Sequence, residues 1–372
     1  MCQEQCNQQQ YEQLLKEYQF DGLETCAVDG LCATACPVDI NTGDLVKRLR
    51  RENHSPVANR IALWTARQFG LVVTLARTAL KIGGMINRIF GKRSMNRLTK
   101  GLQRIMPGMP LWTEQIGQVP DISILSKSNS TNASIVYFPS CISRMLGTYE
   151  GKDQSILDTF LSICRKTGIE VKILSNPNSA CCSQIYGSKG FGAAQRSMAQ
   201  EIFDRLWVDS REGQLPVVID VSSCAYTLHQ LKPYLRSDQQ ERFEKLTVLD
   251  SVDFLYQYVL PCVSEVRKKG KIVLHPVCSL TKMKTTEQFR KIAERFAEEV
   301  TVPVSSGCCG MAGDRGFLIP ELTESATAAE AVEVVQGNYV GYYSTTKTCE
   351  MAMSAAVNKQ YESILYLVEE GL

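Results

Sequence analysis

The chain has 372 residues, 15 cysteines and a formal net charge of +2. A charge this close to zero gives no electrostatic reason to expect nucleic acid as a partner, and the length allows two or three domains. The opening residues, MCQEQCNQQQYEQLLKEYQF, lack the basic and apolar stretches of a secretory signal. We therefore expect a cytoplasmic protein, and in a reducing compartment clustered cysteines bind metal more often than they form disulfides.

The densest group of cysteines lies in the first predicted segment, residues 1–52. Cys26, Cys32 and Cys36 stand at the spacing of a bacterial ferredoxin run, with Asp29 in place of the second cysteine and a proline after the last. This spacing wraps ligands around an iron–sulfur cubane, so the four residues are predicted metal ligands. The role of Asp29 stays open, because a missing thiolate can also leave a three-iron cluster or an open iron.

A basic helical connector is predicted next, at residues 53–120. From Asn53 to Trp112 there is no Asp or Glu, although ten Lys and Arg residues occur. Apolar residues at helical spacing predict two helices, with breaks at Gly83-Gly84 and at Gly91. The longest uncharged run, Gln68–Ala76, is shorter than a membrane-spanning helix.

The basic and amphipathic character of residues 60–104 supports two hypotheses. Such helices are attracted to anionic lipid, which would place the protein peripherally on the inner face of the membrane. Alternatively the connector meets acidic residues of a partner, or its charges simply face water.

The rest of the chain is an internal repeat, which predicts two domains at residues 133–245 and 246–372. Each half has a short apolar strand that ends at a cysteine, then a doubled cysteine, then a further strand that ends near a cysteine. Alternating strands and helices predict an α/β fold with mainly parallel sheets, whose carboxyl ends would bring the cysteines together in one crevice per domain. The predicted ligand sets are Cys141, Cys181, Cys182, Cys224 and Cys278, Cys308, Cys309, Cys349.

The doubled cysteines favour a metal site, because two adjacent thiolates on a tight turn can bind one cluster from the same side. Gly310 follows the second pair and suits a close backbone approach, whereas Ser183 follows the first pair and departs from that pattern. Zinc satisfies four thiolates as well as iron does, and redox-inert packing cysteines are the remaining alternative.

Other cysteines and histidines fit these sets less well. Cys2 and Cys6 are either additional ligands for the first motif or free thiols, and Cys164 and Cys262 are predicted to be packing residues. His275 precedes Cys278 by three positions, so it is either structural or a residue that tunes or binds that site.

Four stretches resemble a known family. TCAVDGLCATACPVDINTGDLVKRLR (25–50) resembles the iron–sulfur portion of flavin-linked D-lactate dehydrogenases that pass electrons to cytochrome or quinone. FPSCISRMLG (138–147), CCSQIYGSKGF (181–191) and CCGMAGDRGF (308–317) resemble the paired cysteine-rich, or CCG, domains of those proteins. CCG domains also occur in glycolate oxidase iron–sulfur subunits, heterodisulfide reductase and anaerobic glycerol-3-phosphate dehydrogenase, so the first stretch is the more specific one.

The resemblance implies a ferredoxin-like segment with a [4Fe–4S] cluster, a helical connector and two tandem CCG domains. It also implies an electron relay from FAD to a quinone or cytochrome. The flavin domain of that family is absent from this sequence, so FAD is expected on a separate domain or subunit. The competing hypotheses are a thiol/disulfide enzyme like heterodisulfide reductase and a zinc-bound structural module.

Overall fold

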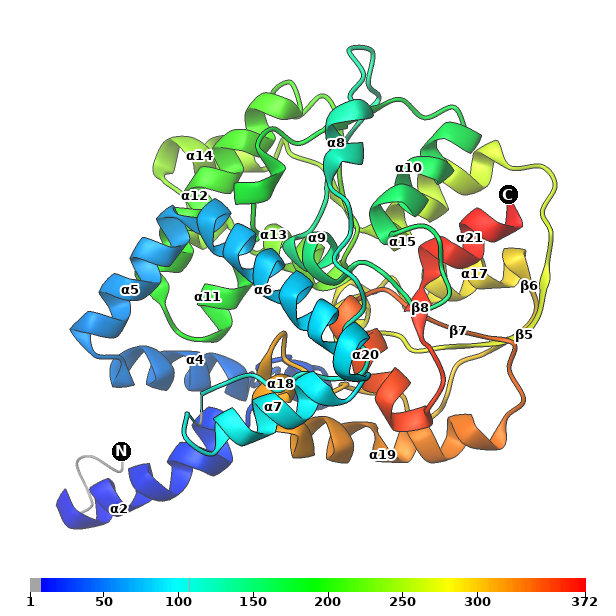
Figure 1. The fold of residues 1–372 in the computed structure, drawn as a ribbon. Helices are drawn as coiled ribbons and strands as arrows, with labels where there is room; N and C mark the ends of the chain where they lie inside the picture. The colour runs from blue at the N-terminus through cyan, green and yellow to red at the C-terminus, as the bar shows by residue number, and fades with distance from the viewer. Residues whose placement is uncertain (1–7, 107) are drawn as a thin grey trace.

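The structure, a computed structural model, describes residues 8–106 and 108–372, so the candidates Cys2 and Cys6 lie outside the described residues. Figure 1 shows two α/β units, with the helices of the N-terminal part lying along one side of them. The elements of the N-terminal part are α2 (Gln8–Tyr18), η1 (Gln19–Glu24), α3 (Leu31–Ala35), α4 (Thr42–Asn53), α5 (Pro56–Arg67), α6 (Phe69–Phe90), α7 (Ser94–Gln103) and α8 (Ser123–Lys127).

The first unit contains a four-stranded parallel sheet in the order β2-β1-β3-β4. Its central strand reads Ile-Val-Tyr-Phe and is buried throughout, as expected for a parallel sheet with helices on both faces. The strands are β1 (Ile135–Phe138), β2 (Val171–Ile173), β3 (Val217–Ile219) and β4 (Val248–Leu249). The helices are α9 (Cys141–Leu146), α10 (Ile156–Lys166), η2 (Pro177–Ser179), α11 (Gln184–Ser188), α12 (Gly192–Asp209), α13 (Ser222–His229), η3 (Lys232–Tyr234), α14 (Ser237–Phe243), α15 (Ser251–Phe254), η4 (Leu255–Val259) and η5 (Leu260–Cys262).

The second unit has a four-stranded parallel sheet in the corresponding order, β6-β5-β7-β8. Its strands are β5 (Lys269–Leu274), β6 (Ala297–Thr301), β7 (Gly341–Ser344) and β8 (Glu362–Ser363). Its helices are α16 (Cys278–Met283), α17 (Thr286–Phe296), α18 (Arg315–Leu318), α19 (Pro320–Gln336), α20 (Lys347–Val357) and α21 (Ile364–Gly371). The α/β class and the parallel sheets agree with the sequence-based prediction.

The boundary between the two units differs from the expected one. We expected the first unit to end at residue 245, but β4 pairs with β3 and therefore belongs to the first sheet. The two units also share one hydrophobic core, because α10 of the first packs against α21 of the second. Phe160 and Leu365 are both fully buried in it. The units are thus held in a fixed relation, which sets the distance between whatever each one binds.

The connector is more continuous than its glycines suggested. A break was expected at Gly83-Gly84, but α6 runs through both and ends at Phe90, before Gly91 as expected. Gly83 is needed for packing, because a Cβ there would lie 2.4 Å from the ring of Trp112. Among the described residues, α6 is the one helix whose length and composition would allow it to cross a membrane, despite the short uncharged run in its sequence.

Candidate metal centres

The first set of cysteines is gathered at the carboxyl end of the first sheet. Cys141 opens α9 just after β1, and Cys224 lies in α13 just after β3. Cys181 and Cys182 lie on the loop between η2 and α11. The thiols form a continuous line of contacts from Cys141 to Cys181, then to Cys182 and on to Cys224. Three elements far apart in the sequence therefore deliver their thiols to one place.

Burial and mutual contact make all four of these thiols weak acids. Contact with Cys181 and burial raise the pKa of Cys141 well above its ordinary value. The pKa of Cys182 is also raised well above that value, because contact with Cys224 and burial outweigh the effect of Cys181. Four adjacent buried thiolates would repel one another, so they need a metal or cluster to supply positive charge. The donor set therefore fits a thiophilic metal centre.

Arg144 lies beside this first set and was not singled out from the sequence. Its side chain is fully buried, and it donates hydrogen bonds to the carbonyls of Pro139, Ser140 and Ala180. Its Nη1 is buried without a hydrogen-bond partner. A buried guanidinium with an unpartnered Nη1, next to Cys141, suits a site where anionic sulfur accumulates.

The second set occupies the corresponding positions of the second unit. Cys278 opens α16 just after β5, and Cys349 lies in α20 just after β7. Cys308 and Cys309 lie on the loop that precedes α18. Here the contacts form two pairs: Cys278 with Cys308, and Cys309 with Cys349, whose sulfur atoms are 2.8 Å apart.

Each of these pairs joins a stronger acid to a weaker one. A hydrogen bond with Cys349 and the neighbouring His275 lower the pKa of Cys309 to about 5, against the opposing effect of burial. Contact with Cys308 lowers the pKa of Cys278, whereas the pKa values of Cys308 and Cys349 are raised by the same contacts. The contacts within the two pairs therefore divide the second set into two more acidic and two less acidic thiols.

His275 lies beside the second set, just after β5 and three positions before Cys278. It is buried, and its Nδ1 lies 2.9 Å from both carboxylate oxygens of Glu330, a partner that the sequence gave no reason to choose. Burial lowers the pKa of His275, but Cys309 and Glu330 outweigh this and raise it to about 9. Its Nε2 forms no well-aligned hydrogen bond, although Cys309 is close. Each set thus has beside it a buried N–H group that could donate a hydrogen bond to the sulfur atoms of a bound cluster.

The two doubled cysteines share one backbone turn. Gly310 follows the second pair with φ of +72°, and Ser183 follows the first with φ of +75°. A side chain at Gly310 would place its Cβ 2.6 Å from the carbonyl oxygen of Leu322. Ser183 makes the same turn in a left-handed conformation, which glycine adopts more easily than serine. Its buried hydroxyl has no hydrogen-bond partner. The departure seen in the sequence therefore leaves the turn unchanged.

Both sets face the interface between the units. Ser222, just after β3, donates a 2.9 Å hydrogen bond to Thr345, just after β7. Helix α13, which carries Cys224, packs against α16, which carries Cys278. The carboxyl ends of the two sheets therefore meet, and both sets of thiols lie at this meeting point.

The N-terminal motif packs against the second set. Lys282 of α16 donates a hydrogen bond to the carbonyl of Asp29 and lies over the ring of Tyr226 in α13, 3.9 Å from its centroid. The Asp29 charge contributes to the environment of both Cys278 and Cys308. Asp29 thus lies between the motif and the second unit.

The three cysteines of this motif are less closely associated than the other two sets. Cys32 is exposed, and its sulfur accepts a 3.2 Å hydrogen bond from Thr42, which lowers its pKa. Cys26 accepts one from the Val28 amide, while Cys36 is half-buried. Within residues 8–106 and 108–372, no group of three or more His, Cys, Asp or Glu side chains has the arrangement of a preformed metal-ion site. The line of four thiols in the first set and the two thiol pairs in the second are thus the closest associations of predicted ligands.

The remaining predicted residues have simpler positions. Cys164 is buried in the core shared by the two units and its pKa is raised by burial, in line with a packing role. The packing role predicted for Cys262 is wrong, because this residue is exposed and its thiol donates a hydrogen bond to the carbonyl of Tyr258.

Comparison with known families gives one match. Residues 135–229 match the CCG cysteine-rich domain. The matched range begins at β1, ends with α13, and includes Cys141, Cys181, Cys182 and Cys224. CCG domains are typical of iron–sulfur proteins associated with oxidoreductases, so the match supports a redox or metal-binding role for this chain. It is also compatible with an iron–sulfur cluster in the first unit.

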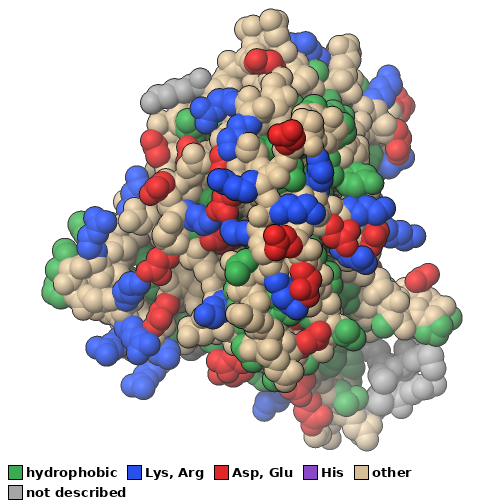
Figure 2. Space-filling view, turned by 90° about the vertical axis from the view of Figure 1, so that its right-hand side faces the viewer, with side chains coloured by type: hydrophobic (Ala, Val, Ile, Leu, Met, Phe, Trp, Pro, Cys, Tyr) green, Lys and Arg blue, Asp and Glu red, His purple; other side chains and the backbone are tan. Residues whose placement is uncertain are grey.

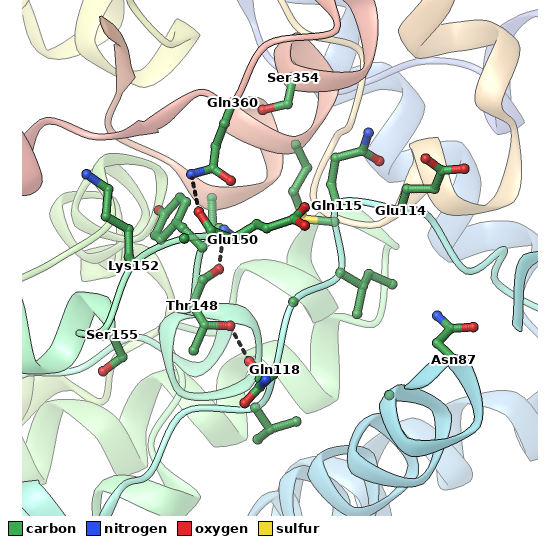
Figure 3. A pocket seen from close by; sticks show the side chains of 18 of the residues that line it. Asn87, Glu114, Gln115, Gln118, Thr148, Glu150, Lys152, Ser155, Ser354 and Gln360 are labelled. Atoms are coloured by element: carbon green, nitrogen blue, oxygen red, sulfur yellow. Dashed lines mark hydrogen bonds between the residues drawn. The ribbon is translucent and has the colours of Figure 1, made fainter. Parts of the chain in front are cut away.

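A large cavity lies elsewhere in the described part of the chain. It has a volume of about 1010 Å³ and is enclosed by α6, the loops around Gln115 and Thr148, and one side of α20. Figure 3 shows mainly polar side chains around it, including Lys152 and Gln360. None of the predicted metal ligands in the described chain lines it, so the thiol sites and this cavity are separate features.

Proposed function

We propose that the chain is the iron–sulfur electron-transfer component of a flavin-dependent D-2-hydroxyacid dehydrogenase, with D-lactate as the substrate class. The observation that carries the proposal is the pair of four-cysteine sets at corresponding strand ends of two units. Both sets face one interface, and the core shared by the units would hold centres bound there at a fixed separation. The match of residues 135–229 to the CCG domain supports the redox assignment of the first set.

The residues have separate tasks in this proposal. The thiolates of each set would hold an iron–sulfur cluster, which when bound accepts and releases single electrons. Arg144 and His275 would direct buried N–H groups at the ligand sulfurs and offset their charge. Cys26, Cys32 and Cys36, with Asp29, would form a third, [4Fe–4S] centre at the edge of the second unit. The hydrophobic core shared by the units would keep the centres at constant separation.

The hydroxy-acid chemistry would take place outside this chain. Oxidation of a 2-hydroxy acid to a 2-keto acid releases two electrons and two protons, and an FAD-binding domain or subunit would take both electrons together. That partner would hand them singly to the thiolate-bound centres, and a quinone or cytochrome would receive them. The sequence contains no nucleotide-binding glycine motif, so we assign FAD to the partner.

The proposal is tested with the full chain, reconstituted without oxygen and mixed with photoreduced FAD in a stopped-flow spectrophotometer. Loss of the iron–sulfur absorbance is expected with reduced FAD, and no loss is expected with D-lactate alone. Reduction by D-lactate alone would contradict a flavin partner. A protein with iron and sulfide that no reduced flavin can reduce would contradict the relay itself.

The spacing of two sulfur atoms in the second set supports a second candidate function. The sulfurs of Cys309 and Cys349 are close enough for thiol/disulfide chemistry, as expected of a protein like heterodisulfide reductase. The two functions make different predictions for alkylation, because cluster ligands are protected from iodoacetamide and redox-active thiols are not. Rapid alkylation of Cys309 in the iron-loaded protein would favour the second function.

A further inference from the structure

The connector exposes an unusual combination of side chains. Ten Lys and Arg residues between Asn53 and Trp112 have no acidic residue among them in the sequence. Lys92 and Arg93 form ion pairs with Glu150 and Glu114 from outside this stretch. Seven further exposed cations have no acidic group within 4.0 Å among the described residues. They are Arg60, Arg67, Lys81, Arg88, Arg97, Lys100 and Arg104.

The contrast with the rest of the surface is plain. Figure 2 shows a face on which Lys and Arg side chains alternate with Asp and Glu. The pair of Lys271 with Glu299 illustrates this pattern within the second unit, and the pair of Lys152 with Glu362 illustrates it between the two units. The absence of acidic residues from Asn53 to Trp112 therefore distinguishes the connector from the face drawn in Figure 2.

Large apolar side chains are exposed between these cations. On α6 they are Leu71, Leu75, Ile82, Met85 and Ile89, each about half exposed or more. Their spacing of four, seven, three and four positions puts them on one stripe of the helix, opposite its buried residues.

The neighbouring helices continue this pattern. Val57, Ile61 and Trp64 form a similar exposed stripe on α5, and Leu98 is exposed on α7. Figure 1 shows α5 and α6 running across one side of the two units, with α7 beside the end of α6. Each of these three helices therefore exposes apolar side chains, and exposed cations lie on or next to all three.

The packing of α6 shows how this surface could meet a bilayer. The opposite side of α6 is fixed to the first unit, because buried Arg77 donates hydrogen bonds to the carbonyls of Arg144 and Pro120. Only 22% of its most apolar window is buried inside the protein. A helix attached along one side and apolar along the other can lie in the plane of an interface, whereas crossing the bilayer would require breaking these contacts.

We propose that α5, α6 and α7 form a docking surface for an anionic lipid bilayer, on which the apolar stripes enter the headgroup region and the flanking cations bind lipid phosphates. Charge complementarity selects this occupant, since the surface has no acidic group of its own. The proposal does not depend on metal content and is separate from the electron-relay proposal. It would place the molecule beside a membrane with α6 parallel to the surface.

The test uses the full chain and sedimentation with phosphatidylcholine vesicles, with or without phosphatidylglycerol. Binding is expected only with the anionic lipid and at low salt, and high salt should release the protein. Trp64, which is 55% exposed on α5, should give a blue-shifted emission on binding, while Trp112 is already buried. The Trp64→Phe variant should bind and lose this shift.

Matched variants separate the docking surface from general charge. Replacing Arg88, Arg97 and Lys100 by Gln should weaken binding about a hundredfold, since each Lys or Arg near an anionic surface strengthens binding roughly fivefold. The same change at three exposed cations elsewhere, Arg196, Lys245 and Lys291, should leave binding unchanged.

A second pair of variants tests the apolar stripe. Leu75→Asn on α6 should weaken binding, and Val335→Asn at the comparably exposed position on α19 should not. Absence of binding to anionic vesicles at low salt, or equal weakening by both sets of charge variants, would overturn the proposal. Binding that resists high salt and does not need anionic lipid would also overturn it, in favour of a spanning helix.

Discussion

The two α/β units have the same strand order but surround their cysteines differently. In the first, all four thiols have raised pKa values, and the neighbouring cation is Arg144, which bonds only backbone carbonyls. In the second, the pKa values of Cys278 and Cys309 are lowered and those of their partners Cys308 and Cys349 are raised, and the neighbouring cation is His275, held by Glu330. The shared strand order brings the thiols together in both units, whereas the groups that contact each thiol set how acidic it is. Two centres on one scaffold can therefore differ in reduction potential.

The largest effect is expected from removing one ligand of either set. Cys181→Ser should abolish the first centre and Cys309→Ser the second, each leaving the other intact, because the sets share no residue. Iron analysis and electron paramagnetic resonance of each variant measure this. Cys164→Ser is the control, since this buried cysteine lies outside both sets and should keep both signals. Simultaneous loss of both signals in either variant would show that the units do not act separately.

The next effect concerns the cation of the first unit. Arg144→Met should lower the free energy of unfolding by about 3 kcal/mol, because buried carbonyls lose charged hydrogen bonds. Loss of the positive charge should also lower the reduction potential of the first centre and leave the second unchanged. Thermal unfolding and redox titration follow the two effects. An equal shift of both potentials would contradict the assignment of Arg144 to one centre.

An exchange of the residues after the doubled cysteines should have opposite effects in the two units. Gly310→Ser should lower the free energy of unfolding by about 1–3 kcal/mol, because the turn has a positive φ and a Cβ would approach Leu322. Ser183→Gly should leave the melting temperature unchanged or raise it, since it removes strain and an unpaired buried hydroxyl. Melting curves of the two variants test this. A lower melting temperature for Ser183→Gly would mean that its hydroxyl has a role the turn does not reveal.

The smallest effect tests how the N-terminal motif is attached to the second unit. Lys282→Met removes the hydrogen bond to Asp29 and the contact with Tyr226, at a cost of about 1 kcal/mol. Hydrogen exchange of residues 25–36 should become faster in this variant. Lys284→Met, two positions further along and exposed, is the matched control and should change nothing. If residues 25–36 exchanged equally fast in both variants, Lys282 would not be the residue that attaches the motif to the second unit.

The sequence predicted the features that follow from local pattern. Apolar runs ending at Cys141 and Cys278 predicted parallel strands with thiols at their carboxyl ends, and the structure has this arrangement. Residues that act through distant packing could not be predicted. Glu330 reaches His275 across the second unit, and nothing in its local sequence distinguishes it from an exposed helical glutamate.

The connector and the N-terminal motif show the same limit. Gly83-Gly84 reads as a helix break in isolation, but the approach of Trp112 explains the glycine within a continuous helix. The spacing of Cys26, Cys32 and Cys36 predicted ligands, yet their contacts in the fold are with Val28 and neighbouring helices. Their assignment as ligands remains a prediction, because the spacing of the cysteines does not determine how the surrounding residues pack.

The most direct test of the account is the metal content of the protein purified without oxygen. Iron, acid-labile sulfide and zinc would be measured together with electron paramagnetic resonance of oxidised and reduced samples, for the parent chain and for Cys181→Ser and Cys309→Ser. The account predicts iron and sulfide in matching amounts, with at least two reducible signals of which each variant loses one. Zinc without redox-active iron would contradict it and leave two structural thiolate sites.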